Sequence, residues 1–71
     1  MKTEIAREQS LSSAKRMLEL LCESWILKEN GAYSAVYMRR KDGVVQERTI
    51  EKLGDRKWIV VETEYEEVGV R

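Results

Sequence analysis

The sequence has no histidine and a single cysteine, and these two features limit its chemistry. Histidine titrates near neutral pH and is the commonest protein ligand of zinc, so the usual acid/base group and the usual zinc ligand are both missing. Cys22 has no second cysteine for an intramolecular disulfide and no imidazole to activate its thiol. We therefore expect no enzymatic activity, no cofactor and no metal site.

No apolar run approaches the length that crosses a bilayer, and residues 1–4 lead into polar sequence instead of the apolar stretch of a secretory signal. Together with the lone cysteine, this favours a cytoplasmic protein with no membrane partner. An excess of one charge is missing too, because 13 basic residues balance 13 acidic ones. The chain therefore lacks the strong overall field of a dedicated nucleic-acid binder.

The composition that is present predicts a single small α+β domain over residues 1–71. With 71 residues, of which 42% are hydrophobic, the chain has enough apolar material for one thin core between two layers. It has too little for a separate ligand cavity of ordinary size, so we expect no small-molecule substrate.

A helical stripe lies in the first half of the chain. Its apolar residues are Leu11, Ala14, Leu18, Leu21 and Trp25, with Met17 and Cys22 widening it. This spacing predicts an amphipathic helix, with Ser10 as its N-cap. Residues 25–29 either complete the helix, which then ends at Asn30 and Gly31, or form a strand with those two residues as a hairpin turn.

The second half favours strands because it is rich in β-branched and aromatic residues. Asp42 and Gly43 predict a type I′ turn, which sets Tyr37 opposite Arg48, and a third strand follows over residues 57–66. The predicted fold is one N-terminal amphipathic helix packed on one face of a three-stranded antiparallel meander, with residues 25–29 as a candidate fourth strand. Residues 68–71 are expected to fray.

The register sorts the strand residues onto two faces, because side chains alternate across a sheet. We expect one set to form the core beneath the helix: Val36, Met38, Val45, Thr49, Ile59, Val61, Thr63 and Tyr65. The other set is then open, and it combines aromatic residues with arginine. Glu47 is at odds with this assignment, because it falls on the core side.

Aromatic residues and arginine dominate the energetics of protein interfaces, so the face left open predicts a partner-binding surface. The residues predicted to bind a partner there are Tyr37, Arg48, Trp58, Tyr33 and Arg39. The chain is accordingly predicted to be a non-enzymatic protein-binding module. Size alone suggests an accessory or inhibitory protein of a phage or mobile element.

Two alternatives remain open at this point. The hairpin of residues 37–50 carries Arg39, Arg40 and Lys41, and a basic ribbon of this kind contacts phosphates in nucleic-acid-binding proteins. The open face would otherwise close a structural homodimer, which enlarges a core that is marginal at this chain length.

Overall fold

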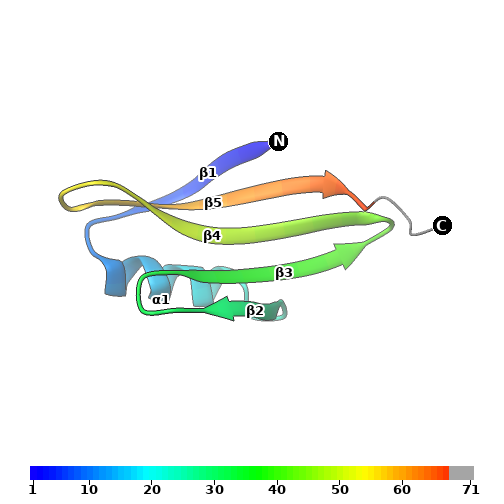
Figure 1. Ribbon diagram of the computed structural model, residues 1–71, viewed down its shortest axis with the longest axis horizontal. Coiled ribbons are helices and arrows are strands. Elements are labelled where there is room, and N and C mark those ends of the chain that lie inside the picture. Colours follow the sequence, from blue (N-terminus) through cyan, green and yellow to red (C-terminus); the bar gives the residue numbers. More distant parts are fainter. Residues whose placement is uncertain (68–71) are drawn as a thin grey trace.

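The computed structural model describes residues 1–67 and contains one five-stranded antiparallel sheet and one helix (Figure 1). In chain order the elements are β1 (Lys2–Glu8), α1 (Leu11–Leu21), β2 (Ile26–Asn30), β3 (Ala35–Lys41), β4 (Val44–Gly54) and β5 (Lys57–Glu66). Within the described residues, no helix is long and apolar enough to cross a membrane.

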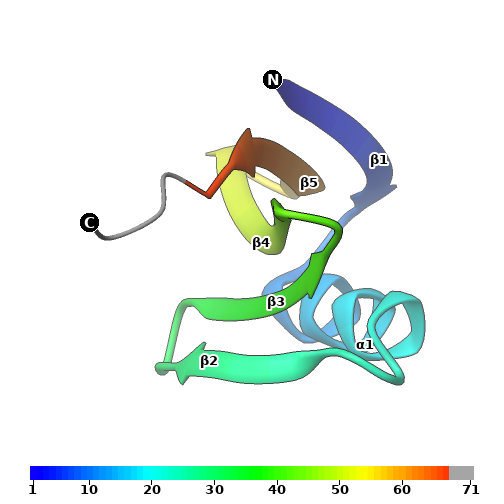
Figure 2. The same cartoon turned by 90° about the vertical axis from the view of Figure 1, so that its right-hand side faces the viewer.

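The sheet has the strand order β1-β5-β4-β3-β2. Strands β2 to β5 form a meander in which each pairs with the next, and β1 from the start of the chain pairs with β5. The two edges are therefore β1 and β2, while β4 lies at the centre. Figure 2 shows the strong twist of the sheet and the helix lying on one of its faces.

The start of the helix agrees with the predicted N-cap, and its end is marked by a backbone hydrogen bond. The Ser10 hydroxyl accepts a hydrogen bond from the Ser13 amide at 3.1 Å, which caps the first turn as predicted. The helix ends at Leu21, and the Cys22 amide donates to the Glu19 carbonyl. The following turn leads directly into β2, so the strand alternative for residues 25–29 is the one that the structure supports, over Ile26–Asn30.

The predicted fold class is wrong in its sheet, which has five strands and not a three-stranded meander. The unpredicted strand is β1, whose residues are mostly exposed and charged. An edge strand of this kind has no alternating apolar pattern, so nothing in its sequence signals a strand. The predicted fraying of residues 68–71 lies outside the described residues.

The predicted assignment of faces is also wrong, because the helix packs on the opposite face. Ala14, Leu18 and Cys22 form the buried cluster with residues from three strands, namely Ala35, Ile50 and Val60. Small side chains at the centre of this contact let the helix approach the sheet closely. The large aromatic residues Tyr37, Trp25 and Trp58 pack around the cluster and are partly buried.

We expect Leu18→Ala to destabilise the protein by about 2–5 kcal/mol, because Leu18 is fully buried and its truncation leaves a cavity. The matched control is Leu20→Ala in the same helix, where the side chain is 66% exposed and the expected change is within about 0.5 kcal/mol. Urea denaturation followed by tryptophan fluorescence measures both. Equal effects of the two substitutions would contradict the packing of this helix face.

Candidate functional site

The aromatic and arginine residues predicted to form an open platform lie beneath and beside the helix. Tyr37 and Trp58 are partly buried against the core, and burial raises the pKa of the Tyr37 hydroxyl above its ordinary value. The Arg48 side chain is only 19% exposed. These three residues are brought to one face as predicted, but the expectation that this face is open is wrong.

Arg48 joins three segments of the chain from its position on the central strand. Its guanidinium forms an ion pair with Glu62 of β5 at 2.8 Å and donates to the backbone carbonyl of Leu21, at the end of the helix. The guanidinium carbon also lies 4.2 Å from the centre of the Trp25 ring. One side chain thus ties the helix end and the turn after it to the middle of the sheet.

Trp25 is contacted by a second arginine as well. The guanidinium carbon of Arg39 lies 4.6 Å from the centre of the same ring, and its Nε donates to the Gln46 side chain at 2.6 Å. Cation–π contacts contribute about 0.5–2 kcal/mol each, depending on how much water they exclude. The turn that joins α1 to β2 is therefore held in place by Arg39 and Arg48 through Trp25.

Four aliphatic side chains around this turn are nevertheless turned toward solvent. Their exposed fractions are 66% for Leu20, 36% for Leu21, 67% for Ile26 and 48% for Leu27. Leu20 and Leu21 end the helix, whereas Ile26 and Leu27 begin β2. In β2, Leu27 lies opposite Tyr37 on the face that carries the helix. Ile26 lies opposite Met38 on the other face, so these residues surround the β2 edge from both sides. We call these four residues the apolar corner.

The apolar corner is the feature that the sequence-based prediction missed. A signal was present, because Ile26 and Leu27 fall off the helical stripe and have no place in a helix-on-sheet core. Tyr33, which was predicted to share the open platform, is 77% exposed and lies in the turn between β2 and β3. It is therefore separate from the residues that surround Trp25.

The basic hairpin predicted to contact nucleic acid lies at the β3–β4 turn, and the structure confirms its register. Asp42 and Gly43 both have positive φ, at 53° and 76°, as a type I′ turn requires. Arg39 contacts Trp25 and Gln46, and Arg40 forms an ion pair with Glu67 at 3.1 Å. Two of the three basic side chains are thus already engaged within the chain, although all three are exposed.

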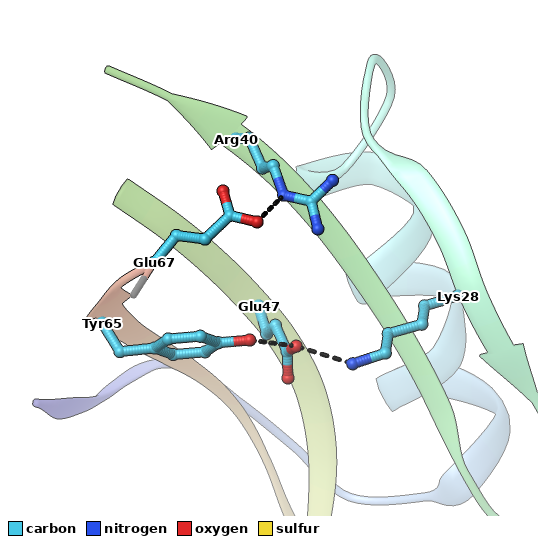
Figure 3. A network of polar contacts seen from close by, with 5 residues as sticks. All are labelled: Lys28, Arg40, Glu47, Tyr65 and Glu67. Atoms are coloured by element: carbon cyan, nitrogen blue, oxygen red, sulfur yellow. Dashed lines mark hydrogen bonds and ion pairs between the residues drawn. The ribbon is translucent and has the colours of Figure 1, made fainter. Parts of the chain in front are cut away.

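The sheet face opposite the helix is covered by polar side chains that reach across the strands. Glu47 accepts hydrogen bonds from the Lys28 ammonium and the Tyr65 hydroxyl, both at 2.9 Å (Figure 3). The bond with Lys28 is the main reason that the pKa of Glu47 is lowered, whereas the bond with Glu47 raises the pKa of Tyr65. Val45, on the same face, is only 2% exposed.

A second ion pair crosses the same face further along the sheet. Lys2 lies opposite Thr63 on β5, Glu51 lies opposite Ile59 on β5, and the two charged side chains pair with each other. The ion pair between Lys2 and Glu51 therefore passes over β5 near Val61, which is 2% exposed. Charged side chains thus cross this face at two places.

The described residues contain no group of three His, Cys, Asp or Glu side chains that could hold a metal ion. A hollow of about 250 Å³ lies beside the β4–β5 turn. Its lining includes Arg7, Leu53, Arg56, Lys57 and Trp58. Two further hollows, of about 340 Å³ and about 370 Å³, lie beside the β3–β4 turn and at the end of β5, so volume alone does not separate these surfaces from the roughly 300–1,000 Å³ of ordinary small-molecule sites. The apolar corner is the candidate for a binding surface because of its exposed aliphatic side chains.

We expect the Cys22 thiol to resist labelling in the native protein. Its side chain is 2% exposed, and burial raises its pKa, which outweighs the opposite effect of the nearby Arg48 guanidinium. Because the thiolate is the reactive form, a disulfide reagent at pH 8 should modify Cys22 slowly until denaturant is added. Rapid stoichiometric labelling without denaturant would contradict the buried position of this residue.

The contribution of Glu47 to stability should be lost in acid. A lowered pKa in the folded state stabilises the protein above the unfolded value of about 4.3, and this contribution disappears as the pH falls through the lower folded value. Glu47→Gln should therefore cost less than about 1 kcal/mol at pH 7 and weaken the acid dependence. Thermal melts between pH 2 and pH 7 measure this.

The matched control for that series is Glu66→Gln, which removes an exposed carboxylate from β5. It should keep the acid dependence of the unsubstituted chain between pH 2 and pH 7. If Glu47→Gln and Glu66→Gln give the same melting curves at every pH, the hydrogen bonds of Glu47 do not contribute to stability.

Comparison with known proteins identifies no relative of the chain. No protein-family model, no curated protein and no solved structure matches the chain. No activity, ligand or partner is therefore transferred to it from another protein.

Proposed function

We propose that the chain is a non-enzymatic protein-binding module and that the apolar corner is its binding surface. The observation that carries this proposal is the exposure of four aliphatic side chains around a turn that Arg39 and Arg48 hold in place through Trp25. A partner that covers these side chains removes apolar surface from water, at about 25 cal/mol for each Å².

Rigidity supports this choice of surface over the other exposed apolar residues. Ordering a flexible segment on binding costs free energy, and a surface that is already fixed avoids that cost. Leu53 is 55% exposed and is the one exposed aliphatic of the β4–β5 hairpin within the described residues, where it lines a hollow with the partly buried Trp58; this hairpin forms the left end of the molecule in Figure 1. Single exposed aliphatics of this kind are normal on proteins, whereas four of them around one turn and one sheet edge favour an interaction site.

Nucleic-acid binding through Arg39, Arg40 and Lys41 is the weaker proposal. Arg39 and Arg40 contact Trp25 and Glu67, so binding phosphate would compete with interactions that they already make. The balanced net charge also provides no long-range attraction to a polyanion. An origin in a phage or mobile element stays a prediction from size alone.

Photo-crosslinking tests the proposal before a partner is known. A benzophenone amino acid placed at Leu20 should give a discrete crosslinked product in the source cells, while the same probe at Leu53 should not. The double variant Leu20→Ser/Ile26→Ser should weaken binding of the captured partner at least about tenfold, which corresponds to about 1.4 kcal/mol. The matched control Leu53→Ser should bind it normally.

Circular dichroism of each variant separates loss of binding from loss of folding. Identical crosslinking at Leu20 and Leu53, or unchanged affinity of a folded double variant, would overturn the assignment of the apolar corner as the binding surface.

A further inference from the structure

Strand β2 is an edge strand that is open along its whole length. It pairs with β3 on one side, and within residues 1–67 no other strand pairs with it. All five of its residues, Ile26–Asn30, are exposed. The unpaired backbone amides and carbonyls of such an edge are complementary to one kind of partner, which is another β-strand.

The opposite edge is better protected against pairing of this kind. Strand β1 carries charged side chains at four of its seven positions, Lys2, Glu4, Arg7 and Glu8, whereas β2 carries two among its five. Both edge ladders contain a register shift, beside Ile5 in β1 and at Lys28 in β2, so it is the charges that distinguish the two edges. Charges along an edge are a usual means by which proteins prevent sheets from joining. On this comparison, β2 is the edge at which a further strand adds most readily.

A lysine on an edge strand usually discourages pairing with another strand, but the Lys28 side chain does not remain at the β2 edge. The register with β3 shifts between Leu27 and Glu29, which leaves Lys28 outside the ladder. Its ammonium reaches over the sheet to Glu47, where it forms an ion pair at 2.9 Å (Figure 3). The edge is therefore left with Ile26 and Leu27 as its exposed apolar side chains.

We propose that two copies of this chain form a two-fold dimer in which β2 of one copy pairs antiparallel with β2 of the other. The inference rests on the proposed function, since it names a second copy as the partner of the apolar corner. The dimer joins the two sheets into one, with both helices on the same face. It buries Ile26 and Leu27 and satisfies backbone groups that otherwise face water.

Symmetry restricts the register of this pairing, and we propose the register centred on Leu27. A two-fold axis between antiparallel strands sets one residue opposite its own copy. An axis at Lys28 or Glu29 sets like charges against each other, which is unfavourable. An axis at Leu27 sets leucine against leucine, on the face that carries the helices, and sets Ile26 opposite Lys28 of the second copy.

Chain length adds a reason for a second copy to bind here. A domain of about 70 residues buries only roughly 60% of the surface that its unfolded chain exposes, and association enlarges a core that is otherwise thin. Closed two-fold dimers are also the commonest assembly of soluble proteins, because one surface serves both partners.

Sedimentation equilibrium over a range of concentrations, with charge substitutions at Leu27, tests the dimer. The unsubstituted chain should sediment as a dimer at high concentration. Leu27→Glu and Leu27→Lys should each weaken self-association by about 100-fold or more, because each sets like charges together at the axis. An equimolar mixture of the two variants should restore the dimer, and the control Leu53→Glu should behave as the unsubstituted chain does.

Hydrogen exchange provides a second readout that a different dimer interface does not reproduce. The amides of β2 should become more protected as concentration rises through the dissociation constant, while those of β1 should not change. A chain that stays monomeric up to millimolar concentration, a Leu27→Glu chain that still forms the dimer, or a dimer with unprotected β2 amides would each overturn the inference.

The outcomes separate this inference from the function on which it rests. If the chain is monomeric but a probe at Leu20 captures a different protein, the apolar corner binds a partner and the dimer is wrong. If neither a dimer nor a crosslinked partner is found, both the binding surface and the dimer are wrong.

Discussion

The contacts of one arginine hold together the helix end, the turn after it and the centre of the sheet. Arg48 projects from β4, the central strand, and meets Glu62, the Leu21 carbonyl and the Trp25 ring on the helix face. A positive charge in this half-buried position is stable because Glu62 compensates it and the carbonyl occupies a further donor. The end of the helix, the turn after it and the start of β2 are positioned by this network.

The parts of the fold that depend on local sequence were predictable. The turn at Asp42 and Gly43 has only one favourable geometry, so the register of β3 with β4 follows from it, and Tyr37 lies opposite Arg48 as expected. The Ser10 cap and the burial of Cys22 in the helical stripe follow in the same way from short-range chemistry. None of these features needs information about distant segments.

The choice of sheet face was not predictable from hydrophobicity, because both faces contain buried residues. Val45, Ile59 and Val61 are nearly as buried as Ile50 and Val60, although the first three lie on the face without the helix. A helix packs closely on a sheet where the facing residues are small, such as Ala35. The number of apolar residues on each face does not reveal this.

Glu47 was the sequence signal that contradicted the predicted choice of face for the helix. A carboxylate on the central strand has no place beneath a helix, but it fits a face on which Lys28 and Tyr65 bond to it. The candidate site depends on long-range geometry of the same kind. The exposure of Leu20 and Ile26 is decided by where the helix ends and by which strand lies at the edge, and neither follows from periodicity.

The pairing of β1 with β5 gives the protein a particular order of assembly during synthesis. Lys2 lies opposite Thr63, so β1 leaves the ribosome before its neighbour β5 and finds it only when almost all the described chain has been made. The meander and its helix are able to form from local contacts before that moment, whereas closure of the β1 edge requires a large loop to be ordered first. Until then β5 is itself an edge, and nascent chains on neighbouring ribosomes present the same unpaired strand to one another.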